Sequence, residues 1–475
     1  MKKVLFAAAE ALPFISTGGL ADVVGSLPAA LCEKGVDARV VIPLYGTMNE
    51  KFRKDLVLVK EIEVQLSWRK QYCGIYKTEH NGVTFYFIDN EFYFKRSSLY
   101  GSFDDGERFA FFSKCVLDIM PHIDFFPDVL HANDWQTALS VIYLRCNYGH
   151  IAEYQKIRTV YSIHNIAYQG IYNLGTMGDV FGINGWDRSI VEYDGCLNLT
   201  KGAIVCCDRL STVSPHYADE IKSAEFAHGL QYIINESSYK LSGILNGIDV
   251  NYYNSVIDPE IPYNFSADDF SGKAKDKAEL QAELGLPVDP EAPMVSMITR
   301  LVSHKGLDLV ECVLEEIIAK DKIQFVLLGT GDANYEAYFR NLEAKYPEKV
   351  RAIIKYDKTL SKKIYAASDI FLMPSKSEPC GLAQMICSRY ATVPVVRETG
   401  GLYDSIKSYN EFTGEGNGFT FTNYNAHDMM YTIRRAMEFY RNKEEWNKIM
   451  KKAITSDFSW AASSESYIEL YESIF

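Results

Sequence analysis

Short apolar segments alternate with helical segments along most of the chain, and the alternation starts a second time past its middle. Short apolar runs bounded by turn residues are typical of strands buried in a parallel sheet, whose two faces the intervening helices cover. In the first half we expect strands at residues 4–9, 38–43, 83–88, 128–131, 159–163 and 210–213 and helices at 20–34, 107–120, 135–147 and 216–222. In the second half we expect strands at 294–299, 324–328, 351–355, 370–373 and 394–396. Residues 57–68 and 72–78 predict an added antiparallel pair.

The repeated pattern predicts two doubly wound α/β domains. A chain of 475 residues is long enough for two or three domains. We place the hinge near residue 245, in the segment GILNGID (243–249), ahead of a polar stretch at 258–272. The last residues are amphipathic and predict a helix. We therefore expect an N-terminal domain over 1–245, a C-terminal domain over 246–457 and a terminal helix over 458–475.

The charge balance narrows the classes of partner. The chain has 49 Lys and Arg against 62 Asp and Glu, a formal net charge of −13. This argues against a general binder of nucleic acid or of membrane surfaces, because both are anionic. A small phosphate ligand needs only a local cluster of donors. The apolar run after Lys2-Lys3 stops at Glu10, which is short for a signal peptide, and no run approaches the roughly 18 residues of a membrane span. We expect a cytoplasmic protein.

The cysteines predict neither disulfides nor a metal site. There are ten, none in a CxxC pair, and most lie in apolar stretches, such as Cys115, Cys146 and Cys387. Buried reduced thiols are the interpretation that this pattern favours.

Two glycine pairs each precede a predicted helix. STGGL covers residues 16–20, after the first strand, and TGGL covers residues 399–402. Glycine lets backbone N–H groups approach an anion closely, and helix N-termini attract negative charge. A plain tight turn is the alternative. Neither segment is a Walker loop or a clean GxGxxG, which weakens the ATPase and dehydrogenase interpretations.

Two polar motifs follow strands of the first half, at the edge where open α/β sheets bind ligands. HANDWQ covers residues 131–136, and its run of four polar or aromatic residues is not expected in the core. Its Asp134 could contact a ligand or cap the next helix. SIHNIAYQG covers residues 162–170, and its His164 could be a base or a partner for a hydroxyl group. No spacing for a metal site is visible around His164.

Two further motifs follow strands of the second half. In TRLVSHKGLD (299–308), Arg300 and Lys305 could converge on a diphosphate, and solvated surface charges are the alternative. In PSKSEPCGLAQ (374–384), Glu378 could accept hydrogen bonds from sugar hydroxyls, and an acid at a helix N-terminus is the alternative.

Taken together in this order, the motifs resemble those of the glycosyltransferase family 5 enzymes, the bacterial glycogen synthases and plant starch synthases, over essentially the whole chain. The resemblance implies the GT-B fold: two Rossmann-like domains that face each other across a cleft, with a C-terminal helix crossing back to the first domain. It implies retaining transfer of glucose from ADP-glucose to the non-reducing end of an α-1,4-glucan, such as glycogen or a maltooligosaccharide. The glucan would bind on the N-terminal side and the nucleotide sugar on the C-terminal side. No metal or other cofactor, and no nucleic-acid or membrane partner, is implied.

The resemblance also implies roles for individual residues. The implied catalytic residues are Asp134, His164, Arg300, Lys305 and Glu378. The implied donor-binding residues are Ser16, Gly18, Gly19, Asn246, Tyr356, Cys380, Gly381, Leu382, Thr399, Gly400 and Gly401. The implied acceptor-binding residues are Glu10, Asp22, Tyr100, Asn165 and Tyr168. The aromatic segment 92–105 falls where the family has a loop near the glucan, and a packed surface loop is the alternative.

One departure from the family pattern concerns the donor. The family usually has lysine where this chain has Ser16, and Lys201 or another basic residue is a candidate to supply the missing charge. We therefore keep UDP-glucose as an alternative donor. A related GT-B transferase of sucrose or phosphorylase type also stays open, although no pyridoxal-phosphate lysine motif is visible. So does a glucan-binding protein without activity.

Overall fold

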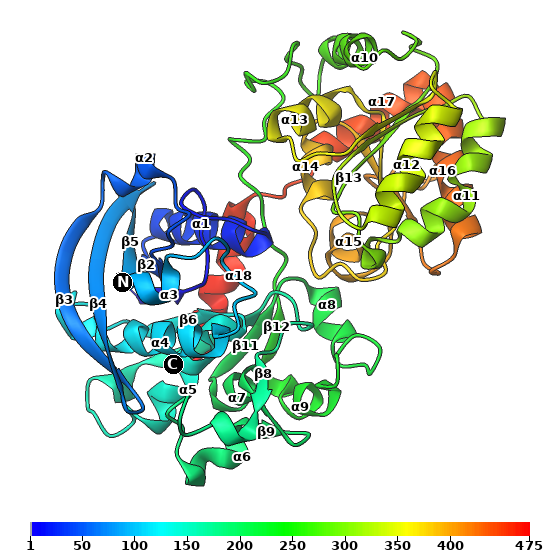
Figure 1. Cartoon of the computed structure of the whole chain (residues 1–475). Helices are drawn as coiled ribbons and strands as arrows, with labels where there is room; N and C mark the ends of the chain where they lie inside the picture. Colours follow the sequence, from blue (N-terminus) through cyan, green and yellow to red (C-terminus); the bar gives the residue numbers. More distant parts are fainter. Residues whose placement is uncertain (1) are drawn as a thin grey trace. The chain divides into compact units, whose positions relative to one another are not determined.

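The computed structural model describes residues 2–475 and divides the chain into two compact α/β units (Figure 1). The first unit comprises Met1–Gly247 and Trp460–Phe475, and the second comprises Ile248–Ser459. Each unit is built on its own mainly or wholly parallel sheet. The expectation of two doubly wound domains is confirmed. None of the helices among residues 2–475 is long and apolar enough to cross a membrane.

The sheet of the first unit has nine strands in the order β12-β11-β7-β6-β1-β2-β5-β4-β3. These strands are β1 (Lys3–Ala7), β2 (Asp37–Pro43), β3 (Val57–Leu66), β4 (Arg69–His80), β5 (Val83–Asp89), β6 (Val129–Asn133), β7 (Arg158–Ile163), β11 (Arg209–Thr212) and β12 (Leu241–Gly243). The strands from β12 to β5 are parallel, and β4 and β3 extend the sheet antiparallel, as predicted. From β1 the chain adds β2, β5 and the antiparallel pair on one side of β1, and it then adds β6, β7, β11 and β12 on the other side. The strand order therefore reverses between β1 and β6.

Helices cover this sheet on both faces. They are α1 (Gly19–Glu33), α2 (Glu50–Arg53), α3 (Glu91–Phe94), α4 (Asp105–Asp118), α5 (Trp135–Cys146), α6 (Arg188–Val191), α7 (Leu199–Cys206), α8 (Pro215–Glu220), α9 (Gln231–Glu236) and α18 (Trp460–Glu472). A small antiparallel sheet, in the order β8-β10-β9, comprises β8 (Ile171–Asn173), β9 (Glu192–Tyr193) and β10 (Cys196–Asn198). The sequence pattern did not predict this small sheet.

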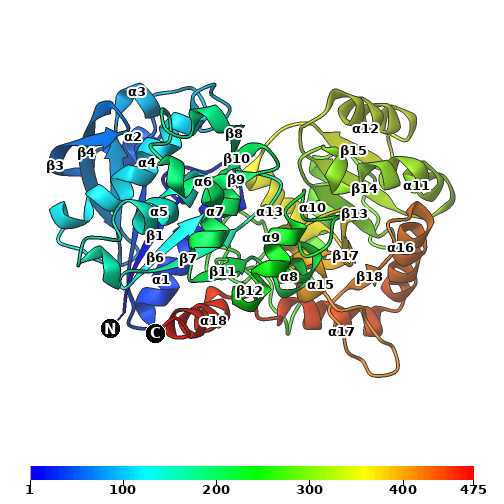
Figure 2. The ribbon, with the colours of Figure 1, turned by 90° about the horizontal axis from the view of Figure 1, so that it is seen from below.

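The C-terminal helix α18 belongs to the first unit, as expected. It lies beside α1 (Figures 1 and 2), and Trp460, Tyr467 and Tyr471 pack in the same apolar core as Val4 and Phe6 of β1. Since Tyr471 is 1% exposed and Tyr467 is also 1% exposed, this helix completes the core rather than lying on its surface.

The sheet of the second unit has six parallel strands in the order β15-β14-β13-β16-β17-β18. These are β13 (Met294–Ile298), β14 (Gln324–Leu328), β15 (Val350–Ile353), β16 (Ile370–Met373), β17 (Val393–Arg397) and β18 (Phe419–Phe421). The helices are α10 (Ser271–Glu283), α11 (Leu307–Lys320), α12 (Ala333–Lys345), α13 (Lys358–Ala367), α14 (Ala383–Arg389), α15 (Gly400–Ser405), α16 (Ala426–Arg441) and α17 (Lys443–Ile454). The strand order is that of a Rossmann fold, which reverses between β13 and β16.

All ten cysteines are free, but they are less uniformly buried than expected. Cys115 and Cys387 are buried, whereas Cys146 is only partly buried and Cys312 is exposed. Cys146 is the last residue of α5, where a side chain reaches the surface more easily than in the middle of the helix.

Candidate active site

In each unit several of the candidate residues follow the two strands between which the strand order reverses. The segment with Glu10 follows β1, and Asn133 and Asp134 lie at the end of β6. In the second unit Arg300 follows β13, and Glu378 follows β16. Loops that leave adjacent parallel strands in opposite directions open a crevice between them, which is where such sheets bind ligands.

Glu10 shapes the first glycine loop. Its side chain is buried, and one carboxylate oxygen accepts hydrogen bonds from Thr17 N at 2.5 Å and Thr17 Oγ1 at 2.8 Å. Burial raises the pKa of Glu10 to about 7, although the hydrogen bonds from Thr17 oppose the shift. Sequence reasoning gave Thr17 no role, because nothing in the sequence indicates that Glu10 turns back onto it.

The glycines of this loop lie at the start of α1. Ser16, Thr17, Gly18 and Gly19 are exposed, and Gly18 occupies the N-cap position of α1 with no side-chain cap. Within residues 2–475, the N–H groups of Gly18 and Gly19 have no hydrogen-bond acceptor. Both N–H groups can therefore donate to a ligand.

Asp134 does not cap α5, although it occupies the N-cap position. Its Oδ1 instead accepts a hydrogen bond from His164 N, after the neighbouring strand β7, at 2.7 Å. The backbone of Asp134 has φ 57° and ψ 179°, a conformation that costs a non-glycine residue about 1–3 kcal/mol and is commonest at functional sites. Burial raises the pKa of Asp134 to about 7. The capping alternative is therefore wrong for the side chain.

Asn133, the last residue of β6, holds the ring of His164. The distance from Asn133 Oδ1 to His164 Nε2 is 2.9 Å. Burial lowers the pKa of His164 to about 4, so the ring is neutral at neutral pH. The expectation that residues 133–136 avoid the core is wrong in part, since Asn133 and Gln136 are buried. β6 lies between β1 and β7 in the sheet, and α5 packs against α4 and α7.

His131 serves the core instead of the site. It is 0% exposed, and its Nδ1 lies 2.7 Å from Tyr471 Oη of α18, while its Nε2 lies 2.6 Å from Ser162 Oγ. Burial lowers its pKa to about 3. His131 therefore anchors the C-terminal helix to the centre of the sheet.

The implied acceptor-binding residues are arranged unevenly. Burial raises the pKa of Tyr100, and the charges of Tyr45, Glu10 and Asp134 add to this shift. Asn165 is partly buried beside His164, and Tyr168 is 61% exposed. Asp22 lies in the first turn of α1.

The segment 92–105 is partly a packed loop, as its alternative interpretation holds. Tyr93 is buried and donates a hydrogen bond from its hydroxyl group to Glu107 at 2.6 Å, and Phe94 is buried as well. Phe92 and Phe103 are exposed.

Glu378 and Lys305 form an ion pair in the second unit. Lys305 Nζ lies 2.6 Å from Glu378 Oε2, and Ser375 Oγ donates to the same oxygen at 3.0 Å. Glu378 is 7% exposed. Its other oxygen, Oε1, has no partner among residues 2–475 and is not enclosed by protein atoms, so it can accept a hydrogen bond from a ligand.

Arg300 and Lys305 both lie in the segment between β13 and α11. Arg300 is exposed just after β13, and Lys305 lies in the 3₁₀ turn Ser303–Lys305. Burial lowers the pKa of His304, and the charges of Lys305 and Arg300 act in the same direction, whereas the charge of Glu378 opposes them. Both cations therefore belong to the segment that follows one strand, β13.

The second glycine pair differs from the first. Gly401 N donates to the carbonyl oxygens of Glu378 and Pro379, both at 3.1 Å. The sequence pattern suggests an N–H group that is free to bind a phosphate, but this one is already occupied. A Cβ atom on Gly400 would lie 2.0 Å from Glu378 O, and one on Gly401 would lie 2.1 Å from Cys380 O. The pair lets α15 pack directly against the backbone that carries Glu378.

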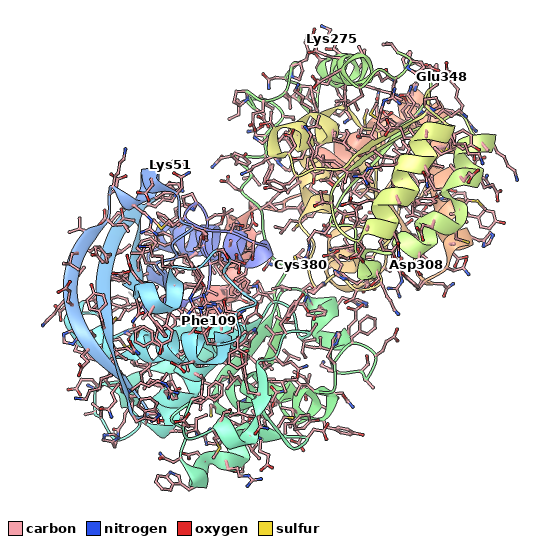
Figure 3. The ribbon with its side chains drawn as sticks, viewed as in Figure 1. Lys51, Phe109, Lys275, Asp308, Glu348 and Cys380 are labelled. Atoms are coloured by element: carbon pink, nitrogen blue, oxygen red, sulfur yellow. The ribbon has the colours of Figure 1, made fainter. Side chains whose placement is uncertain are left out.

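The remaining implied donor residues are dispersed. Gly381 has φ 73° beside Cys380 (Figure 3) and Leu382, in the loop before α14, and Thr399 is the N-cap residue of α15. Tyr356 is 87% exposed after β15.

Asn246 belongs to the first unit, not to the C-terminal domain in which the sequence places it, because the division falls after Gly247. It is buried, and its Oδ1 has no partner within residues 2–475.

Lys201 does not replace the lysine absent at Ser16. Its side chain is buried, and Nζ donates to the carbonyl oxygens of Ser189 at 2.5 Å and Ile190 at 2.9 Å. Burial lowers its pKa. No group of three or more His, Cys, Asp or Glu side chains in the described part of the chain, residues 2–475, is arranged to hold a metal ion.

Comparisons with known proteins agree with this architecture. Residues 3–236 match the family described as starch synthase catalytic domain, and residues 277–453 match glycosyl transferases group 1. A starch synthase IV catalytic domain from Arabidopsis thaliana, solved with ADP and acarbose bound, has a TM-score of 0.91 and 34% identity, and the match covers 100% of this chain and 99% of that one. A sucrose-phosphate synthase from Thermosynechococcus elongatus, with a TM-score of 0.62, 15% identity and coverage of 100% and 99%, shares the fold.

Curated relatives match along the whole chain. A glycogen synthase from Bacillus cereus is 48% identical over 477 residues, which cover 99% of each chain. A glycogen synthase from Geobacillus stearothermophilus is 46% identical over 474 residues, which cover 99% of this chain and 98% of that protein. Identity of this degree over the full length settles the family. The chain is a glycosyltransferase with the GT-B fold, and it belongs to the family of bacterial glycogen synthases and plant starch synthases.

Proposed function

We propose that this protein transfers glucose from a nucleotide-glucose donor to the non-reducing end of an α-1,4-glucan, with retention of the anomeric configuration, and that the donor is ADP-glucose. The relatives named glycogen synthase and the starch synthase solved with ADP and acarbose support the reaction and the donor. The observation that carries the proposal is the Lys305–Glu378 ion pair, whose residues follow β13 and β16, the two strands between which the order of the second sheet reverses.

The second unit supplies the groups that face the donor. Breaking the glycosidic bond adds negative charge to the departing diphosphate and positive charge to the sugar. Arg300 and Lys305 stabilise the diphosphate, and preorganised charges of this kind are often the largest catalytic contribution. Glu378 accepts hydrogen bonds from glucose hydroxyls through Oε1, because Oε2 is already held by Lys305 and Ser375.

Further donor contacts follow from exposed backbone and aromatic groups. The free N–H groups of Gly18 and Gly19, at the N-terminus of α1, bind a phosphate oxygen. Tyr356 stacks on the base with its exposed ring. The remaining donor-binding residues that we propose are Ser16, Asn246, Cys380, Gly381, Leu382, Thr399, Gly400 and Gly401.

The first unit supplies the glucan side. We assign acceptor binding to Glu10, Asp22, Tyr100, Asn165 and Tyr168, which offer carboxylate, amide and aromatic surfaces to sugar rings. Asp134 and His164 act next to the sugar that is transferred, with Asp134 holding the backbone of His164. The acceptor hydroxyl attacks from the face that the diphosphate leaves, and the diphosphate takes its proton, so no protein nucleophile is required.

The assay that tests this proposal uses glycogen with ADP-glucose or UDP-glucose and measures the diphosphate released. We expect turnover with ADP-glucose, and loss of it in Glu378→Ala. Glu415→Ala, which removes an exposed carboxylate of the same unit, is the control and should keep full activity. Turnover with UDP-glucose alone would overturn the choice of donor. Absence of turnover with both donors would overturn the reaction.

A further inference from the structure

We propose that Asn133 is a positioning residue that fixes the proton of His164 on Nε2, so that Nδ1 is left as a hydrogen-bond acceptor for a hydroxyl group of the bound sugar. The role of the sugar rests on the proposed function, but the position of the proton does not.

The orientation of the Asn133 amide is fixed first. Its Nδ2 donates to the carbonyl oxygens of Ala7 at 3.1 Å and His131 at 3.2 Å. Carbonyl oxygens only accept, so the amide nitrogen must face them. The opposite orientation would set the amide oxygen against two carbonyl oxygens and leave buried polar atoms unpaired, which costs more than a hydrogen bond contributes. The oxygen Oδ1 therefore faces His164.

The position of the proton on His164 follows. Asn133 Oδ1 can only accept, and it lies 2.9 Å from His164 Nε2, so Nε2 must carry a hydrogen. Burial lowers the pKa of the ring to about 4, so at neutral pH the ring holds one proton only. Nδ1 therefore has a lone pair and no hydrogen.

The free nitrogen is open to a ligand. Nδ1 of His164 has no hydrogen-bond partner among residues 2–475, and it is not one of the enclosed polar atoms that lack a partner. A neutral ring with an acceptor nitrogen suits a sugar hydroxyl, which can donate to it. Such a ring does not act as a cation for the diphosphate, which leaves that task to Arg300 and Lys305.

Two consecutive residues thus hold His164 at two points. Asp134 Oδ1 holds its backbone N–H at 2.7 Å, and Asn133 holds its ring. Neighbouring side chains on a strand normally point to opposite faces of the sheet. The φ of 57° at Asp134 breaks that alternation and lets both residues reach the same neighbour.

The test is nitrogen NMR of the full-length protein with labelled histidine and no ligand, with the signals of His164 identified by their loss in His164→Gln. We expect the Nδ1 shift of a nitrogen without hydrogen and the Nε2 shift of a nitrogen with hydrogen, unchanged between pH 8 and pH 6. A proton on Nδ1 would overturn the proposal. This readout needs no turnover, so it stands or fails separately from the proposed reaction.

The variant Asn133→Asp extends the test to function. An anion beside Nε2 should raise the pKa of His164 and favour the doubly protonated ring, which has no acceptor nitrogen. The titratable groups next to His164 are His131, whose pKa the charge of His164 lowers, and Asp134, which accepts from the backbone N–H of His164, and both remain in the variant. We expect kcat about 10-fold or more below the wild type at pH 6.5, recovering as the pH rises and the ring becomes neutral.

The matched control is Asn184→Asp, which makes the same change at an exposed position of the first unit. It should leave kcat and its pH profile unchanged. If Asn133→Asp leaves the titration of His164 and the pH profile as in the wild type, Asn133 does not set the state of the ring. If Asn133→Asp does not fold, the wild-type NMR result alone decides the proposal.

Discussion

Replacement of Gly400 by alanine tests how the second glycine pair supports Glu378. Gly400 has φ 44°, and an added Cβ would lie 2.0 Å from Glu378 O. Real Cβ atoms essentially never approach within 3.0 Å of a heavy atom outside their own and the adjacent residues. The carbonyl group of Glu378 must therefore retreat by about 1 Å. Gly414 is the matched control, because it has φ 68° and nothing within 4 Å of its added Cβ.

The two variants share one cost and differ in another. Alanine in the left-handed region costs about 1–2 kcal/mol at either position. Only Gly400→Ala adds the cost of overpacking, typically about 1–3 kcal/mol, so it should destabilise the protein by about 1–3 kcal/mol more than Gly414→Ala. Urea unfolding measures the difference. A displacement of about 1 Å at Glu378 should also lower kcat about 100-fold, as measured by diphosphate release. Equal stability and equal kcat in the two variants would refute this reasoning.

Three further predictions concern other groups of the site. Arg300→Ala or Lys305→Ala should each lower kcat about 10²–10³-fold, and unchanged kcat in both would remove them from catalysis. Ser16→Lys should change the KM for the donor, and unchanged KM for both donors would place Ser16 away from it. Because the pKa of Glu10 rises from 4.5 to about 7 on folding, its contribution to stability is full below pH 4.5 and is lost as the pH rises through 7. As the pH rises from 4.5 to 7, the free energy of unfolding of the wild type should therefore fall by up to about 3 kcal/mol more than that of Glu10→Gln, as measured by urea unfolding. Plots of unfolding free energy against pH that run parallel for the two proteins would contradict this.

The sequence predicts the parallel strands well because their signal is local. A buried parallel strand is a short apolar run, and β14 and β16 begin and end at the predicted residues. The predicted helix after residue 458 is also found, because its amphipathic pattern is local. The small strands β8, β9 and β10 were missed because two or three residues carry no periodicity.

The contacts of the site could not be predicted in the same way. Lys305 and Glu378 are 73 residues apart in the chain, and the strand order brings them together. The residues were recognised as candidates, but their pairing depends on which strands are neighbours. The same holds for the contact of His131 with Tyr471, at a separation of 340 residues. Because α18 returns to the first unit, Tyr471 reaches the strand that carries His131.

The product of the reaction tests the central claim most directly. A maltooligosaccharide tagged at its reducing end is incubated with ADP-glucose and the wild-type protein, and the products are separated by size. We predict lengthening by single glucose units, with new bonds that an enzyme specific for α-1,4 linkages removes, and no lengthening by Glu378→Ala. Diphosphate release without lengthening, new bonds that resist this enzyme, or equal lengthening by Glu378→Ala would contradict the claim.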